Sequence, residues 1–133
     1  SPPAVFQSVW LWKFGLWAGF SVSSRQWPTG HTFSTGFRFD GDGKSIVYAT
    51  DFSAITREMV ELFDDCDLLG TDCLRREPHP THAHVALALE LADAVRAKQT
   101  VLTHLDKSLD YATLSLEVPP HVLVGFDGME LMA

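Results

Sequence analysis

Apolar runs of strand length alternate with amphipathic stretches through much of this sequence, and that alternation limits the possible folds more than any other feature. Residues 67–74 and 101–103 are two such runs, and residues 85–96 between them carry an apolar stripe at helical spacing. Strands that alternate with helices predict the α/β class. The stripe is made of Val85, Ala88, Leu89, Ala92 and Val95.

Turn residues and helix caps predict the remaining elements. Asp40-Gly41-Asp42-Gly43 is typical of a β-hairpin turn, and Asp127-Gly128 predicts a second turn near the end. Thr56 is a suitable cap for a helix, and Asp110 is another. The expected strands are residues 36–40, 45–50, 67–74, 101–103, 122–126 and 129–131, and the expected helices are residues 56–63, 85–96 and 109–116.

The first 29 residues differ in character from the rest. Residues 9–20 (VWLWKFGLWAGF) hold three of the four tryptophans and alternate as a strand does, whereas Ser21–Gly30 reads as a polar connector. A membrane helix needs roughly 20 apolar residues, and this run is shorter and contains Lys13. We therefore expect a Trp-rich N-terminal segment over 1–29 and a separate half-domain over 30–133, without a membrane span.

Composition limits the class of protein. The 133 residues suit one domain, and 46% hydrophobic with 20% charged residues is typical of globular chains. A formal charge of −7 argues against general nucleic-acid binding, because excess acid repels a phosphate backbone. Cys66 and Cys73 lack metal-motif spacing and read as free thiols of an intracellular protein, and no secretory signal is recognisable. We therefore expect a cytoplasmic location.

Four polar residues are predicted at strand ends or in adjacent loops. His104 follows the strand over 101–103, Asp51 follows the strand over 45–50, His82 lies in a proline-rich loop, and His31 precedes the first hairpin strand. The C-terminal ends of strands face the crevice where α/β proteins place their chemistry. Imidazole and carboxylate together suit zinc, manganese or iron. The alternative is that His104 is an ordinary half-buried loop histidine.

The order of five motifs is more specific. GHTFSTGFRF, IVYATD, LLGTDCLRREPHPTHAH, VLTHLDKSLDYATL and VLVGFDGMEL together resemble the C-terminal half of metallo-β-lactamase-fold hydrolases, in the PhnP-like phosphodiesterase branch. The resemblance implies half of a four-layer αβ/βα sandwich, with a mixed sheet and helices on one face. It also implies two divalent ions, zinc or manganese, with Asp51 bridging them and His104 as the last ligand. His82 would lie beside the substrate phosphate and assist proton transfer.

Two departures from the family pattern bear on this site. The motif T-H-x-H-x-D-H, which supplies most family ligands, is absent, and THAHVAL at Thr81–Leu87 has Val-Ala where Asp-His belongs. His31 stands two residues after the usual ligand position, so it either replaces that ligand or the ligand is missing. Within the loop, His84 is expected to start a helix and His79 to bind no metal. Asp72 either orients a ligand from behind or anchors a loop.

Two hypotheses follow. The first is a metal-dependent hydrolase of phosphodiester or cyclic phosphate bonds in a small phosphate-ester substrate, incomplete as given and binding metal weakly or partially. The second is a truncated or degenerate non-catalytic domain. Its uncovered apolar sheet face would then dimerise or pair with a missing N-terminal half.

Overall fold

A single mixed sheet forms the frame of the protein. The computed structural model describes the backbone of residues 5–13 and 16–131, and the side chains of residues 21–131. The sheet order follows the chain order, β1 to β7, with β1 to β4 antiparallel and β4 to β7 parallel. Its strands are β1 (Val5–Lys13), β2 (Leu16–Thr29), β3 (Thr32–Gly41), β4 (Lys44–Ala49), β5 (Leu68–Asp72), β6 (Gln99–Thr103) and β7 (Val122–Val124), and the helices are α1 (Arg57–Phe63), α2 (Val85–Ala94) and α3 (Tyr111–Glu117).

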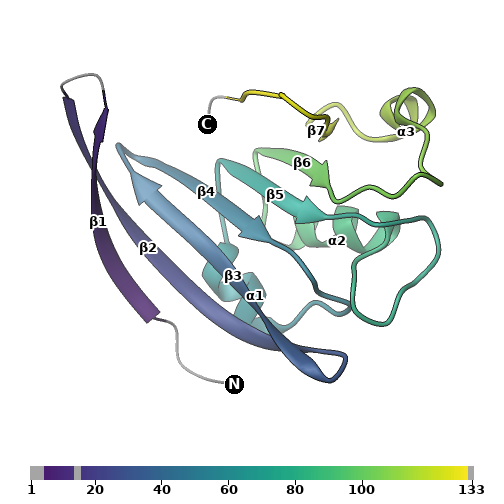
Figure 1. Ribbon diagram of the computed structural model, residues 1–133, viewed down its shortest axis with the longest axis horizontal. Helices are drawn as coiled ribbons and strands as arrows, with labels where there is room; N and C mark the ends of the chain where they lie inside the picture. Colours follow the sequence, from purple (N-terminus) through teal and green to yellow (C-terminus); the bar gives the residue numbers. More distant parts are fainter. Residues whose placement is uncertain (1–4, 14–15, 132–133) are drawn as a thin grey trace.

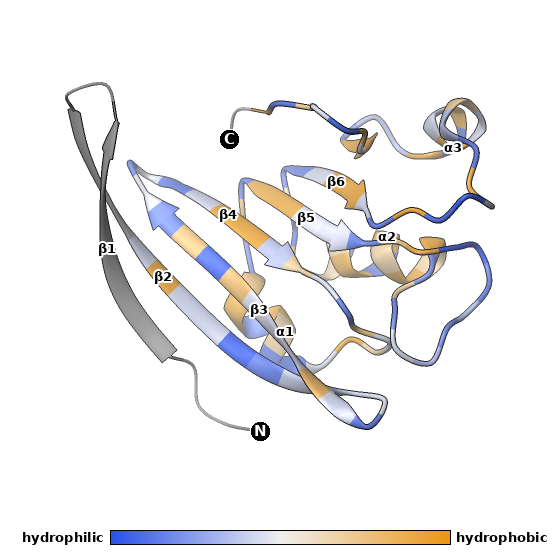
Figure 2. Cartoon of the chain, viewed as in Figure 1, coloured by the Kyte–Doolittle hydropathy of each residue, from blue (hydrophilic) through white to orange (hydrophobic). Residues whose placement is uncertain are grey.

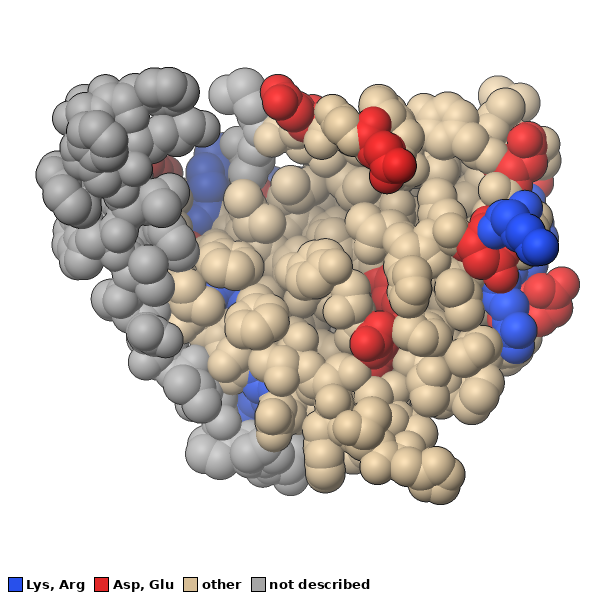
Figure 3. Space-filling view, in the orientation of Figure 1, with Lys and Arg blue, Asp and Glu red and all other residues tan. Residues whose placement is uncertain are grey.

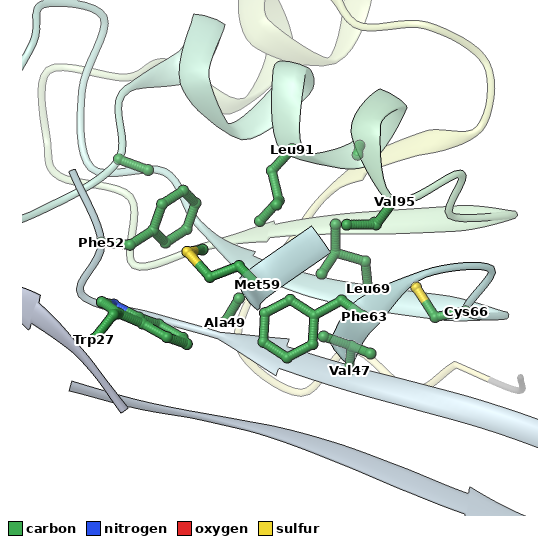
Figure 4. Packing of buried hydrophobic residues seen from close by; sticks show 12 residues of the cluster. Trp27, Val47, Ala49, Phe52, Met59, Phe63, Cys66, Leu69, Leu91 and Val95 are labelled. Atoms are coloured by element: carbon green, nitrogen blue, oxygen red, sulfur yellow. The ribbon is translucent and has the colours of Figure 1, made fainter. Parts of the chain in front are cut away.

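Helices α1 and α2 cover one face of the sheet, which lies in front of them in Figure 1. Side chains of β4 alternate, so that Val47 and Ala49 are buried beneath the helices. Figure 4 shows Met59 and Phe63 of α1 packed with Trp27 of β2 in this core. The α/β class, the mixed sheet and the helical face are confirmed.

Local signals place the helix starts as predicted. The Thr56 side chain accepts a hydrogen bond from the Met59 N–H at 3.2 Å, and the Asp110 carboxylate accepts one from the Thr113 N–H at 2.9 Å. His84 occupies the cap position before α2, with no side-chain cap bond. Among the described residues, no helix has the length and apolar content needed to cross a bilayer.

The predicted connector over Ser21–Gly30 is wrong, because these residues belong to β2. They pair with β3 in an antiparallel ladder, and every second side chain turns inward, including Ser23 and Trp27. Pairing with β3 and burial of Trp27 outweigh the low strand preference of the serines. Residues 9–20, predicted as one strand, include the end of β1 and the start of β2. These two strands pair in an antiparallel ladder that ends at Lys13 and Leu16. Residues 14–15 and the side chains of this run lie outside the described part.

The strand predicted over residues 129–131 is also wrong. The ladder of β7 ends where the Gly125 N–H donates to the Leu102 carbonyl, at 2.9 Å. The Met129 N–H then donates to the Phe126 carbonyl, so the predicted turn at Asp127-Gly128 closes on itself and leads to no return strand. The division into residues 1–29 and 30–133 remains a prediction, although β2 and β3 share one sheet.

The face opposite the helices is apolar and uncovered by the described residues. Phe37, Ile46 and Tyr48 are exposed there, although strands of a parallel sheet usually have both faces covered. Figure 2 shows hydrophobic residues along β4, β5 and β6, and Figure 3 shows few charged groups over the middle of this face. A hollow of about 370 Å³ lies on it, lined mainly by β4, β5 and β6 and by the residues after β7.

Candidate metal centre

Four side chains converge at the carboxyl ends of the parallel strands. Asp51 follows β4, Asp72 ends β5, His104 follows β6, and His82 comes from the loop between β5 and α2. One potential ligand atom from each lies within 4.8 Å of the others. Parallel strands bring their carboxyl ends to one edge, and this is why residues so distant in sequence meet. The structure therefore brings three predicted residues, Asp51, His82 and His104, together with Asp72.

Asp72 holds the group together. Its carboxylate is fully buried, and each oxygen accepts a hydrogen bond from a histidine Nδ1 at 2.9 Å: Oδ1 from His104 and Oδ2 from His82. Oδ2 also accepts from the backbone N–H groups of Asp51 and Ala83, both at 3.2 Å. A buried carboxylate requires such partners to offset lost hydration. Asp72 thus orients two imidazoles and anchors the loop, which joins the two roles proposed from the sequence.

These contacts determine the tautomers of both histidines. A carboxylate only accepts hydrogen bonds, so Nδ1 of His82 and Nδ1 of His104 carry the proton. His82 Nδ1 also lies 3.1 Å from an Asp51 oxygen, and the two rings stand 4.7 Å apart. The Nε2 lone pairs are left for a metal ion or a proton. A carboxylate behind a histidine is the usual support of a metal ligand.

The backbone at two of these positions is unusual. Asp51 has φ of 56° and His104 has φ of 61°, which lies in the left-handed region that favours glycine. Such strain persists where surrounding contacts over-determine it, and it is common at functional sites. Here the Trp27 indole N–H donates to the Asp51 carbonyl at 3.2 Å, while the Asp51 N–H is held by Asp72. The side chains of Asp51 and His104 remain half exposed.

An open hollow of about 430 Å³ adjoins the two half-exposed side chains. That volume is within the range of small-molecule sites. The hollow is lined by Tyr48, Thr50, Asp51, Thr103 and His104.

The other predicted ligand, His31, is exposed on the turn between β2 and β3 and is not one of the four clustered residues. This turn is fastened to the loop of His82, since the Thr29 hydroxyl donates to the Thr81 carbonyl at 2.9 Å. A Cβ on Gly30 would lie 2.7 Å from the Thr81 side chain, so the contact requires glycine. A ligand role for His31 remains a prediction.

The residues present fit part of a metal site. Asp51 oxygens and the Nε2 atoms of His104 and His82 are donors of the kind that zinc and manganese accept. A closed zinc site takes four ligands, and a catalytic one takes three with an open position. With His82 assigned to proton transfer, the clustered side chains supply two ligands, Asp51 and His104, and the weak or partial binding expected from the sequence remains a prediction.

Comparison with known proteins matches this picture. Residues 15–105 match the beta-lactamase superfamily domain. A crystal structure of a diphosphatase from the PhnP family superposes with a TM-score of 0.76 and 29% identity, covering 92% of this chain and 45% of that one. Zinc-bound PqqB from Methylobacterium extorquens superposes with a TM-score of 0.64 and 17% identity, covering 86% of this chain and 50% of that one. At this identity the match supports the fold alone.

One curated relative is an octanoyltransferase of Porphyromonas gingivalis. It is 32% identical over 87 residues, which are 64% of this chain and 18% of that protein. The chain thus spans less than a fifth of this relative and about half of the solved structures that share its fold. The fold observed here is accordingly the half sandwich predicted from the motif series.

Proposed function

The chain belongs to the metallo-β-lactamase superfamily, and from that premise we propose that it acts as a metal-dependent hydrolase of phosphodiester or cyclic phosphate bonds. The superfamily match and the fold establish a hydrolase-like domain with a possible His/Asp metal cluster. The observation that carries the finer proposal is the convergence of Asp51, His82 and His104 on one rim of the sheet. The diphosphatase name of a 29% identical relative supports phosphate chemistry.

Each residue has a defined part in this proposal. Asp51 and His104 hold metal through a carboxylate oxygen and Nε2, with His104 oriented by Asp72. When bound, zinc or manganese supplies Lewis acidity and a nucleophile at neutral pH. His82, held through Nδ1, presents Nε2 for proton transfer to the leaving oxygen. The family resemblance implies two ions, and further ligands would have to come from outside the four clustered residues.

The test is hydrolysis of bis(p-nitrophenyl) phosphate and a 2′,3′-cyclic nucleotide by the zinc- or manganese-loaded chain. His104→Ala should reduce the rate to background, because it removes a ligand at the rim. The matched control is His121→Ala, since His121 is exposed beside β7 and outside the cluster. Equal activity of wild type and His104→Ala would end the proposal.

A second candidate function is favoured by the uncovered apolar face. Exposed apolar patches of this kind mark interaction sites. The large exposed hydrophobic side chains of this patch include Ile46, Tyr48 and Phe126. The domain would then catalyse nothing and bind a partner, either a second copy or a polypeptide equivalent to the unmatched half of its structural relatives. Elemental analysis with light scattering separates the candidates: zinc or manganese bound to the chain, up to about two ions, favours the hydrolase, and a metal-free dimer favours the binding domain.

We propose a small phosphate ester as substrate and no general nucleic-acid partner, given the formal charge of −7. The cytoplasmic location expected from the sequence is likewise a proposal. Cys66 and Cys73 are both buried free thiols, which suits a reducing compartment.

A further inference from the structure

His79 adds a third imidazole to the rim of the cluster. It lies three residues before His82, and the two ring centroids are 5.1 Å apart with planes inclined by 54°. His82 in turn stands 4.7 Å from His104. Three imidazoles therefore follow one another along the rim, and only the two nearer β6 are hydrogen-bonded to Asp72 among the described contacts.

The hydrogen bonds give His79 the opposite tautomer. Its Nδ1 accepts a hydrogen bond from the Thr81 backbone N–H at 3.2 Å, and a backbone N–H can only donate. Nδ1 of His79 must therefore carry a lone pair, and the single proton of the neutral ring lies on Nε2. His82 and His104 carry their proton on Nδ1. Along the rim, two rings offer an Nε2 lone pair and the third offers an Nε2–H donor.

The surroundings of His79 keep this donor in place. The Arg75 guanidinium donates to the carbonyls of Glu77 at 3.2 Å and Pro78 at 2.7 Å, which fixes the loop just before the ring. Partial burial lowers the pKa of His79, and the positive charge of Arg75 lowers it further, while the Asp72 carboxylate opposes both. The Thr81 N–H can donate to Nδ1 only while Nδ1 carries a lone pair, so this hydrogen bond keeps the proton of the ring on Nε2.

We infer that His79 is a substrate-binding residue whose Nε2–H donates to an anionic oxygen of the substrate phosphate, beside the leaving group served by His82. The inference rests on the proposed function, whose substrate is a phosphate ester. Anionic phosphate oxygens only accept hydrogen bonds, and in the proposed function Nε2 of His104 is directed to the metal and Nε2 of His82 to the leaving oxygen. The Nε2–H of His79 is therefore the ring donor left for a non-leaving phosphate oxygen. Arg75 adds positive charge nearby in a chain with seven excess acids.

The experiment measures binding of inorganic phosphate to the zinc-loaded full chain, with the histidine ring nitrogens observed by ¹⁵N NMR. His79→Asn keeps an acceptor at the Nδ1 position for the Thr81 N–H but has no group at Nε2, whereas His79→Gln can place an amide donor near Nε2. Asn should weaken phosphate binding about tenfold, the size of a charge-assisted hydrogen bond, and Gln should restore most of it. His121→Asn is the control and should bind as wild type does.

Three results would overturn the inference: an Nδ1–H tautomer at His79, wild-type phosphate affinity in His79→Asn, or no phosphate binding by the wild-type chain. Protection of the Thr81 amide from exchange should be retained in His79→Asn, and this separates loss of the donor from loss of the loop. A chain that binds phosphate through His79 but cleaves no diester supports this inference and refutes the hydrolase. If the wild-type chain cleaves diesters and His79→Asn binds phosphate as the wild type does, the hydrolase is supported and this inference is refuted.

Discussion

Replacing Asp72 with asparagine should change the tautomer of His104. The amide has one acceptor oxygen, and three of the four hydrogen bonds, from the His82 Nδ1 and the Asp51 and Ala83 N–H groups, converge on the Oδ2 position. The amide oxygen is expected to take that position. The NH₂ group then faces the His104 Nδ1, which must become an acceptor. His104 would carry its proton on Nε2, where it blocks the metal.

The magnitude follows from burial and from the number of bonds affected. Asp72 is fully buried, so solvent does not screen the loss. Loss of the supporting carboxylate should weaken metal binding by about 10–100-fold. Weaker bonds to a neutral acceptor should lower the free energy of unfolding by about 1–3 kcal/mol.

Zinc affinity is measured by competition with a chromophoric chelator, tautomers by ¹⁵N NMR, and stability by urea unfolding. Asp110→Asn is the matched control, because asparagine also caps a helix and Asp110 lies outside the cluster. Unchanged zinc affinity in Asp72→Asn, or an Nδ1–H tautomer of His104 in that variant, would refute the reasoning.

Three further predictions test the fold and its electrostatics. Gly36→Ala should lower the free energy of unfolding, measured in urea, by about 2–4 kcal/mol, because a Cβ would lie 2.4 Å from the buried Trp27 ring. A decrease below about 0.5 kcal/mol would contradict that packing. Asp67 has a lowered pKa, mainly through its hydrogen bond from Lys98, so its stabilisation should be complete above its unfolded pKa, near 3.8, and disappear as the pH falls through the lower folded value. Thermal melts of wild type and Asp67→Asn should converge below pH 3.8, and a constant gap would count against the contact. Burial raises the pKa of Cys66 to about 11, so mass spectrometry should detect no alkylation by iodoacetamide at pH 8 until denaturant is added, and rapid native labelling would disprove this.

Much of the site was predictable because strand ends are local features. Asp51 lies two residues after an alternating strand and His104 directly follows β6, and parallel strands bring such residues to the same edge. The Thr56 and Asp110 caps are likewise set by contacts within one helical turn. The resemblance of the motif series to a known family added the half-sandwich fold and implied that His82 lies beside the other two.

Only the tertiary structure decided which partner each residue has. Asp72 and His104 are 32 positions apart, so no local pattern shows that one carboxylate orients two histidines. The Ser-rich residues of β2 become a strand because β3 pairs with them and Trp27 finds a core. His31 is on an exposed turn, although its place in the sequence resembled that of the other ligands. The sequence therefore determined which groups reach the rim of the sheet, because periodicity and caps act over a few residues. The fold determined their tautomers and partners, because those depend on contacts between distant segments.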